Sequence, residues 1–200
     1  MGELPKPPDT IVVLVTETEG HCYKGMSYTR TTMDFKEYVK GVLPAEWGNS
    51  WHEESLKAGA IAAKMFGWSM YETYGYVWDC NWNQVYRPEW RTDATDKAVD
   101  DTWDWILLSN NKIVRTFYDN TYSTCLGRDL DGKCMGQWDS LTDAEEGMNW
   151  KEILAKYYKG STLVEIGKEE TDRERLDAVK EIEVYYKRKP IRLYYLYWLY

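Results

Sequence analysis

The sequence is poor in basic residues relative to acidic ones, and this imbalance excludes one class of partner. Its 200 residues include 25 Lys and Arg against 33 Asp and Glu, which leaves a net charge of −8 at pH 7. A nucleic-acid-binding surface needs clustered Lys and Arg to neutralise phosphates. We therefore expect no nucleic-acid partner.

Long apolar runs and a leader sequence are also absent. The chain contains no stretch of about eighteen apolar residues, so no membrane span is predicted. The first residues, MGELPKPPDT, lack the basic and apolar regions of a signal peptide. The chain is therefore expected either to act inside the cell or to have had a leader removed.

The chain has few histidines and cysteines, and the number of cysteines is even. The chain has four cysteines, Cys22, Cys80, Cys125 and Cys134. They allow two disulfides in any of three connectivities, and a pair between Cys125 and Cys134 is favoured because these residues flank a short Gly-bearing loop. The alternative, a zinc site, needs a cluster of Cys or His. Because the only histidines are His21 and His52 and no CxxC spacing occurs, no metal is expected.

Phenylalanine is rare, whereas the other aromatic residues are abundant. Eleven Trp and seventeen Tyr stand against three Phe, and 44% of the residues are hydrophobic. This content is enough for the core of one domain. Trp and Tyr combine an apolar face with a polar group, so they suit partly hydrated surfaces on which sugar rings stack, although most single aromatic residues belong to a core.

The pattern of apolar residues predicts an α+β fold in which a long Ala-rich helix packs on short, mostly antiparallel strands. The predicted strands are 10–16, 27–33 and 161–166, with a hairpin in 103–120 that turns at Asn110-Asn111. The predicted helices are a short one after a cap at Asp34, a long one over 51–74 after a Ser50–Glu53 capping box, one over 95–102 and one over 150–158 capped by Asn149 and Glu152. Pro44 is expected to break the chain, and 121–147 is expected to be a long polar loop.

Three segments are expected along the chain. Residues 1–9 are Pro-rich and are predicted to be a disordered lead-in. Residues 10–167 form the main domain. Residues 168–200 change to a charged and then strongly aromatic composition, and their role is unknown.

One acidic residue has unusual surroundings. In YVKGVLPAEWGNSWHEESLKAGAIAAKMF, residues 38–66, Glu46 lies in an uncharged stretch just before the long helix, whose small residues Gly59, Ala63 and Gly67 recur every four positions. Such a stripe allows another part of the chain to pack closely against the helix. Because Gly has a lower helix propensity than Ala, its presence here indicates close packing. Glu46 itself is either an exposed carboxylate near a helix N-terminus or a catalytic acid.

These residues resemble the signature of the SpoIID/amidase-enhancer family, in which a turn ending in Pro-Ala-Glu precedes a long Ala-rich helix. NQVYRPEW, KAVDDTWDWILLSNNKIVRTFYDN and CMGQWDSLTDAEEGMNWKEILAKYYKGSTLVEI resemble three further family elements in the same order. The likeness covers Thr10 to Ile166. It implies a peptidoglycan lytic transglycosylase that cuts glycan strands between N-acetylmuramic acid and N-acetylglucosamine and leaves 1,6-anhydro ends, with Glu46 as the catalytic acid and base.

The resemblance has departures. Lys64 stands where the family usually has Arg, Gly136 replaces Ser, and Asp139-Ser140 replaces Gly-Ala. Lys keeps the charge but loses the bidentate fork of Arg. Some relatives hold a metal with His and Cys after the hairpin, and this stretch, TYSTCLGRD, has no His.

The implied reaction explains why one acid can suffice. Most glycosidases need two carboxylates, but here the C6 hydroxyl of the sugar attacks from within the same molecule. One group then protonates the leaving oxygen and later accepts the hydroxyl proton. Leu43, Pro44 and Trp47 are expected to desolvate Glu46 and so to keep it protonated near neutral pH.

Six further residues are candidates for substrate binding, in a groove beside Glu46. The candidates for hydrogen bonding are Lys64, Gln84, Tyr86 and Gln137, and the candidates for stacking are Trp47 and Trp138. For each of them a role in scaffolding or core packing is the alternative. No cofactor is implied.

Two other functions compete with the enzyme. The departures favour a non-catalytic module that binds cell-wall glycan or enhances an amidase. The aromatic C-terminal segment favours a structural domain that docks another protein. If the enzyme interpretation holds, the partners are peptidoglycan strands, a wall hydrolase is a further candidate, and the location is extracytoplasmic, where disulfides persist.

Overall fold

The computed structural model describes residues 4–167, and a compact unit ends at Ile166. The elements are, in order, β1 (Thr10–Thr16), β2 (Tyr28–Asp34), α1 (Phe35–Glu46), α2 (Glu53–Tyr74), β3 (Val77–Trp78), the 3-10 turn η1 (Pro88–Trp90), α3 (Asp93–Thr102), β4 (Trp105–Ser109), β5 (Lys112–Ile113), β6 (Phe117–Asp119), α4 (Tyr122–Gly127), β7 (Cys134–Gly136), α5 (Gln137–Glu145), α6 (Trp150–Tyr157) and β8 (Thr162–Glu165). The predictions for residues 1–3 and 168–200 fall outside the described residues.

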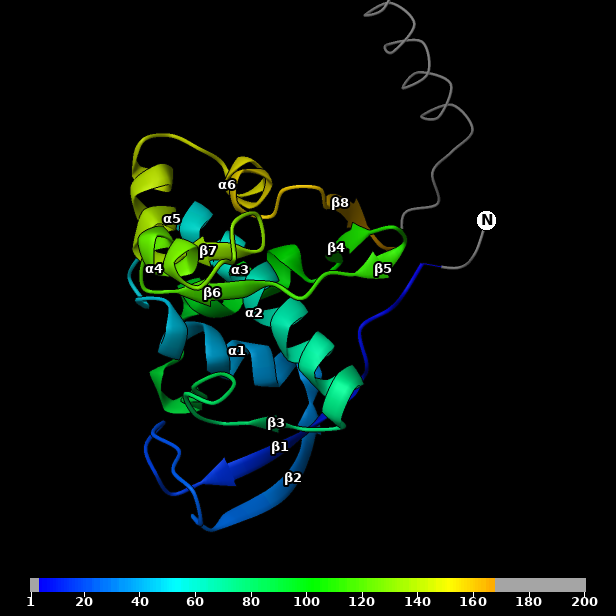
Figure 1. Cartoon of the computed structure of the whole chain (residues 1–200), viewed down its shortest axis with the longest axis vertical. Helices are drawn as coiled ribbons and strands as arrows, with labels where there is room; N and C mark the ends of the chain where they lie inside the picture. Colours follow the sequence, from blue (N-terminus) through cyan, green and yellow to red (C-terminus); the bar gives the residue numbers. More distant parts are fainter. Residues whose placement is uncertain (1–3, 168–200) are drawn as a thin grey trace, which may run out of the picture. The chain divides into compact units, whose positions relative to one another are not determined.

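The strands form three small sheets, with orders β2-β1-β3, β5-β4-β8 and β6-β7. The β1–β2, β4–β5 and β4–β8 pairs are antiparallel, whereas β1–β3 and β6–β7 are parallel. In Figure 1 the β2-β1-β3 sheet lies below α1, and β6, β7, α4 and α5 lie above it. The predicted α+β class with mostly antiparallel strands is confirmed.

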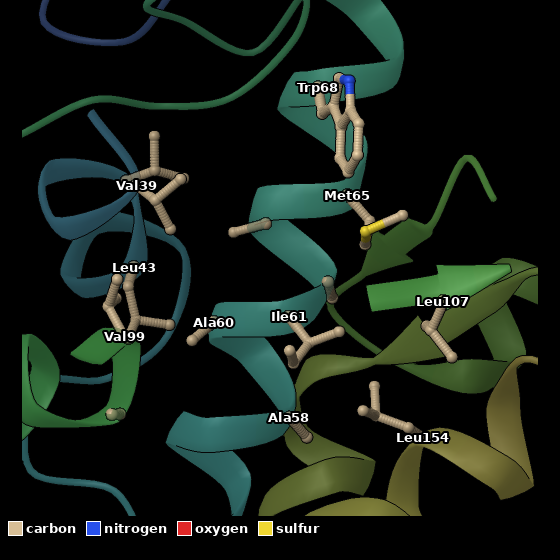
Figure 2. Packing of buried hydrophobic residues seen from close by; sticks show 14 of the residues in the cluster. Val39, Leu43, Ala58, Ala60, Ile61, Met65, Trp68, Val99, Leu107 and Leu154 are labelled. Atoms are coloured by element: carbon tan, nitrogen blue, oxygen red, sulfur yellow. The ribbon is translucent and has the colours of Figure 1, made fainter. Parts of the chain in front are cut away.

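Helix α2 is the centre of the core. Figure 2 shows Val39 and Leu43 of α1 and Val99 of α3 on one side of it, and Leu107 of β4 and Leu154 of α6 on the other. Because the helix is covered on opposite sides, its buried positions extend around most of its circumference. Burial of this apolar surface is the main source of stability for the fold.

The small residues of α2 make room for aromatic and amide side chains. A Cβ atom on Gly59 would lie 2.6 Å from the ring of Trp47, and one on Gly67 would lie 2.8 Å from Oε1 of Gln84. The sequence pattern predicted a close neighbour, and the structure identifies it as side chains from the residue that follows α1 and from the segment before η1. This close contact holds the end of α1 against α2.

Several predicted helix ends are confirmed, but the predicted start of α2 is wrong. Asp34 caps α1 by accepting from the Glu37 amide at 2.9 Å, and Asn149 forms its capping box with Glu152. Helix α2, however, begins at Glu53 and is capped by His52, not by a Ser50–Glu53 box. The reason is a turn closed by the Trp51 amide on the Gly48 carbonyl, which precedes the helix and leaves Ser50 outside it.

Pro44 does not end α1, contrary to the prediction. The helix continues to Glu46, because a proline in the last turn removes only one backbone hydrogen bond and the Trp47 amide donates to the Leu43 carbonyl. This extension makes Glu46 the last residue of α1. It is therefore at a helix C-terminus and not at the N-terminus of α2.

The segment 121–147 is also not a loop, because it contains α4, β7 and α5. Strand β7 pairs in parallel with β6, and Cys125 of α4 is bonded to Cys134 of β7. The predicted Cys125–Cys134 disulfide is confirmed, whereas the pairing of β6 with β7 was not visible in the local composition. The predicted turn is confirmed, because Asn110 and Asn111 have φ values of 51° and 59° between β4 and β5. The hairpin is shorter than predicted, because β6 pairs with β7 and not with β4.

Candidate active site

An open cleft of about 460 Å³ lies beside the end of α1. It is lined by Glu46, by Phe66, Met70 and Tyr74 of α2, by Asn81, Trp82, Asn83 and Val85 before η1, by Arg115, Phe117, Tyr118, Asp119 and Asn120 around β6, and by Arg128 and Gln137. The lining mixes aromatic, amide and charged groups. Such a mixture is typical of sites that bind polar ligands with flat apolar faces.

Glu46 is held in the cleft by donors from two distant segments. Its Oε1 accepts from the Val85 amide at 2.6 Å. Gln137 Nε2 donates to the Glu46 carbonyl oxygen at 2.6 Å and lies 3.4 Å from Oε2. The carboxyl group is therefore oriented from both sides, and it is half-buried against the cleft.

The surroundings raise the pKa of Glu46 from its ordinary value to about 7, chiefly because burial disfavours the charged form. The hydrogen bonds from Val85 and Gln137 act in the opposite direction, and the negative charge of Asp119 adds to the increase. The position at a helix C-terminus also disfavours a carboxylate. Both the acid and the carboxylate form of Glu46 are therefore accessible near neutral pH.

The hydrogen bonds also distinguish the two carboxyl oxygens. Oε1 already accepts a short hydrogen bond from the Val85 amide. A proton on Oε1 would point its own hydrogen toward this N–H donor, so protonation of that oxygen is disfavoured. Oε2 has only the long contact with Gln137, whose amide is mainly engaged by the Glu46 carbonyl. The acid proton of Glu46 is therefore placed on Oε2.

Gln137 owes its position to the junction of β7 and α5, where the sequence departs from the family pattern. A Cβ atom on Gly136 would lie 2.3 Å from the Tyr122 amide nitrogen, so only glycine fits. Asp139 accepts from that same amide at 2.6 Å, and Ser140 donates to the Gln137 carbonyl at 2.6 Å. The departures at these positions thus form a consistent local network that orients Gln137.

A second carboxylate lies in the same cleft and was missed by the sequence analysis. Asp119, at the end of β6, accepts from the Asn120 amide at 2.8 Å and from Arg128 at 2.9 Å. Arg115, also in the cleft, donates to Ser69 Oγ and Thr73 Oγ1 of α2, each at 2.6 Å. In the sequence Asp119 was only a polar residue near the end of the predicted hairpin over 103–120.

Gln84 and Tyr86 do not line the cleft. Gln84 is buried; its Nε2 donates to the Ala63 carbonyl at 3.0 Å and to the Tyr118 hydroxyl at 2.8 Å, and its Oε1 accepts from Tyr38 at 3.2 Å. It supports the cleft from behind through Tyr118. Tyr86 stacks on Tyr38 with ring centroids 5.5 Å apart.

Lys64 lies in the core and not in the cleft. Its Nζ donates to the carbonyls of Thr102, Trp103 and Trp105 at 3.2, 2.6 and 2.7 Å and lies over the Trp103 ring. Burial lowers its pKa to about 7. All three ammonium hydrogens are used by these carbonyls, so the predicted contact with substrate does not fit this position. The lysine instead joins the end of α3 to α2.

The two candidate stacking residues have different positions. Trp47 is buried against Tyr118 and Gly59, and its Nε1 donates to Ser140 at 3.3 Å. Trp138 is 56% exposed and contacts Trp51, with ring centroids 4.6 Å apart, but it is not among the cleft residues. Of the seven predicted site residues, the structure therefore brings Glu46 and Gln137 together in the cleft.

The cysteines do not fit a metal site. Cys22 is bonded to Cys80 and Cys125 to Cys134. Within residues 4–167, the one group with metal-ligand spacing is Cys22, Asp79 and Cys80, and its two sulfurs are bonded to each other. The metal held by some relatives after the hairpin would need thiolate and imidazole ligands, which this region does not offer. Within the same range, no helix has the length and apolar content to cross a membrane.

Fold and site together define an α+β domain in which one half-buried carboxylic acid, with a pKa near neutrality, forms part of the wall of an open polar and aromatic cleft. Residues 23–108, less than half of the chain, match the sequence model of SpoIID, described as Stage II sporulation protein, and this match supports the assignment of this part of the chain to that family. The matched residues include Glu46 but end before Asp119 and Gln137. No curated protein matches the chain.

Proposed function

We propose that this protein is a peptidoglycan lytic transglycosylase with Glu46 as the general acid and base. The observation that supports it most is the carboxyl group of Glu46, which lies in the cleft and whose pKa of about 7 allows both protonation states near neutral pH. The substrate is the glycan strand, cut between N-acetylmuramic acid and N-acetylglucosamine.

In the first step Oε2 of Glu46 donates its proton to the glycosidic oxygen, and the bond between that oxygen and C1 of N-acetylmuramic acid breaks. The Val85 amide and Gln137 then stabilise the carboxylate that forms. Positive charge develops on the sugar ring in this step. Glu46 and Asp119, both at the cleft wall, supply negative charge near it.

In the second step the C6 hydroxyl of the same sugar attacks C1, and Glu46 takes the hydroxyl proton. One C–O bond breaks, another forms, and the proton passes from the C6 hydroxyl to the leaving sugar through Glu46, so no water is consumed. An intramolecular attack does not need a base that positions water. The product is a 1,6-anhydro end, and Glu46 is again protonated.

Asp119 raises hydrolysis as a second candidate reaction, because hydrolytic glycosidases use two carboxylates. Its two oxygens, however, are engaged by the Asn120 amide and by Arg128. A carboxylate committed to these partners is poorly suited to activate water, so we favour the transglycosylase. Incorporation of ¹⁸O from labelled water into the new ends would identify hydrolysis instead.

The test is digestion of purified glycan strands, with and without stem peptides, followed by mass spectrometry. The wild-type protein is expected to release products that end in 1,6-anhydro sugars, each lighter by one water than the hydrolytic product. Glu46→Gln keeps the shape but has no proton to donate, so it should release none. A matched control is Glu145→Gln at an exposed carboxylate. Identical digests from the wild type and Glu46→Gln would refute catalysis and favour the non-catalytic glycan-binding module.

An extracytoplasmic location is part of the proposal. Peptidoglycan lies outside the cytoplasm, and two disulfides are stable in that environment. A wall hydrolase that acts on the same strands is a candidate partner. Thiol alkylation of the protein in intact cells checks the location, because cysteines that react without prior reduction would contradict it.

A further inference from the structure

Three aromatic side chains form a row on the surface beside the cleft. They are Tyr28 at the start of β2, Trp78 of β3 and Trp82 in the segment that follows. The ring centroids of Tyr28 and Trp78 are 5.1 Å apart and those of Trp78 and Trp82 are 5.2 Å apart, both in edge-to-face contact. Tyr28 is 55% exposed and Trp82 is 47% exposed, so the two ends of the row offer ring surface to solvent.

The row is continuous with the cleft. Trp82 and its neighbours Asn81 and Asn83 line the same cleft as Glu46. From Trp82 the row passes through Trp78 to Tyr28, which pairs with Thr16 at one end of the β2-β1-β3 sheet. A ligand that leaves the cleft past Trp82 therefore meets further aromatic surface.

The segment that carries Trp82 is held in place before any ligand binds. The disulfide between Cys22 and Cys80 anchors its start, and the Asn81 amide donates to the Gly20 carbonyl at 2.9 Å. Asn83 Oδ1 accepts from the Trp78 amide at 2.8 Å, which ties the segment to β3. Binding to such a preorganised surface loses little conformational entropy.

Polar groups for a sugar lie next to the rings. Asn81 Oδ1 accepts from the Cys22 amide at 3.0 Å, and this bond orients the side chain. Its NH₂ group has no partner among residues 4–167 and is exposed at the cleft. Sugars present apolar ring faces and hydroxyl or acetamido groups at their edges, a combination that aromatic rings beside an amide complement.

We propose that Trp82, Trp78 and Tyr28 form a sugar-binding subsite that continues the cleft, so that the protein binds several sugars of an N-acetylhexosamine glycan beyond the bond at Glu46. The identity of the glycan rests on the proposed function, but the binding subsite does not require cleavage. Because a pyranose ring is similar in size to a six-membered aromatic ring, a row of three side chains contacts more than one sugar. Affinity is therefore expected to increase with strand length.

The test measures binding by titration calorimetry in the full chain with Glu46→Gln, which prevents turnover. The probes are a disaccharide, a tetrasaccharide and an octasaccharide of alternating N-acetylglucosamine and N-acetylmuramic acid. The octasaccharide is expected to bind much more tightly than the disaccharide. Adding Trp82→Ala or Tyr28→Ala should weaken octasaccharide binding by roughly two- to tenfold, the range expected for loss of one aromatic contact.

Matched variants separate stacking from misfolding. Trp90→Ala removes a ring that is 50% exposed but is not among the cleft residues, and octasaccharide binding should not change. Trp82→Phe keeps an aromatic face and should restore most of the affinity. Near-UV circular dichroism and thermal unfolding check that each variant folds.

The outcomes distinguish the subsite from the enzyme. Equal octasaccharide affinity in the Trp82→Ala, Tyr28→Ala and Trp90→Ala variants would refute the subsite, while cleavage of glycan by the wild type would still support the enzyme. Length-dependent binding that is lost in the first two variants, together with no cleavage by the wild type, would support the subsite and refute the enzyme. Absence of binding to any strand would refute both.

Discussion

Replacing Glu46 by Gln should change the stability of the protein in a way that depends on pH. The free energy of unfolding depends on pH wherever the folded and unfolded states bind different numbers of protons. Burial raises the pKa of Glu46 to about 7 from its ordinary value of 4.5. Between these values the folded state holds a proton that the unfolded state has lost, so the contribution of Glu46 to stability decreases as pH rises.

The magnitude follows from this difference. A shift from 4.5 to about 7, at about 1.36 kcal/mol per pKa unit, corresponds to roughly 3 kcal/mol. The stabilisation is fully present below pH 4.5 and is lost as pH rises through 7. Since part of the side chain faces the cleft and water, 3 kcal/mol is the upper end of the expected effect.

The assay is urea unfolding followed by tryptophan fluorescence at pH 4, 6 and 8.5, with the free energy extrapolated to water. Relative to the wild type, Glu46→Gln should gain roughly 2–3 kcal/mol on going from pH 4 to pH 8.5, because Gln carries no charge that must be buried. The buried Lys64 is present in both proteins, so its own titration cancels in the comparison. The exposed Glu145→Gln serves as the control.

The result that would refute this reasoning is a constant difference. If the wild type and Glu46→Gln follow parallel curves from pH 4 to 8.5, Glu46 has an ordinary pKa in the folded protein. The carboxyl group would then be a poor general acid at neutral pH, and the proposed mechanism would lose its main support. A difference confined to the control would point to long-range charge effects instead.

Two further predictions concern stability. Lys64→Met should destabilise the protein by roughly 3–5 kcal/mol, because it leaves three carbonyls without their donor. The control Lys97→Met, at a side chain that is 64% exposed, should change stability by no more than about 0.5 kcal/mol. Urea unfolding checks both variants, and equal effects would contradict the placement of Lys64 in the core. Replacing both Cys22 and Cys80 by Ser opens a loop of 58 residues and should lower the free energy of unfolding by about 4 kcal/mol. The same change at Cys125 and Cys134, which are 9 residues apart, should lower it by about 3 kcal/mol. Thermal unfolding compares the two double variants, and an unchanged midpoint in both would show that the disulfides do not constrain the unfolded chain.

The sequence alone predicted those features that depend on neighbouring residues. The β1 strand, the cap of α1 at Asp34, the Asn110-Asn111 turn and the α6 capping box all follow from local propensities and hydrogen bonds within a few residues. The glycine and alanine stripe of α2 also indicated that this helix has close neighbours. The same local rules failed at Pro44 and over 121–147, where contacts with distant segments decided the structure.

The candidate site was only partly predictable for the same reason. The family resemblance singled out Glu46 and Gln137 in advance, but their chemistry depends on contacts between segments far apart in the chain. Val85 lies 39 residues from Glu46 and Gln137 lies 91 residues from it. Nothing in the sequence indicated that Lys64 would be enclosed by backbone carbonyls or that Asp119 would share the cleft with Glu46.

What the sequence by itself determined is those elements that local propensities and caps specify, and the presence of an isolated acid ahead of an Ala-rich helix. What only the tertiary structure decided is the environment of that acid: the Val85 amide on one oxygen, the Gln137 side chain beside the other, and Asp119 at the same cleft. The physical reason is that a pKa depends on burial and on nearby charges and donors in space, and these come from residues that only the folded chain brings together.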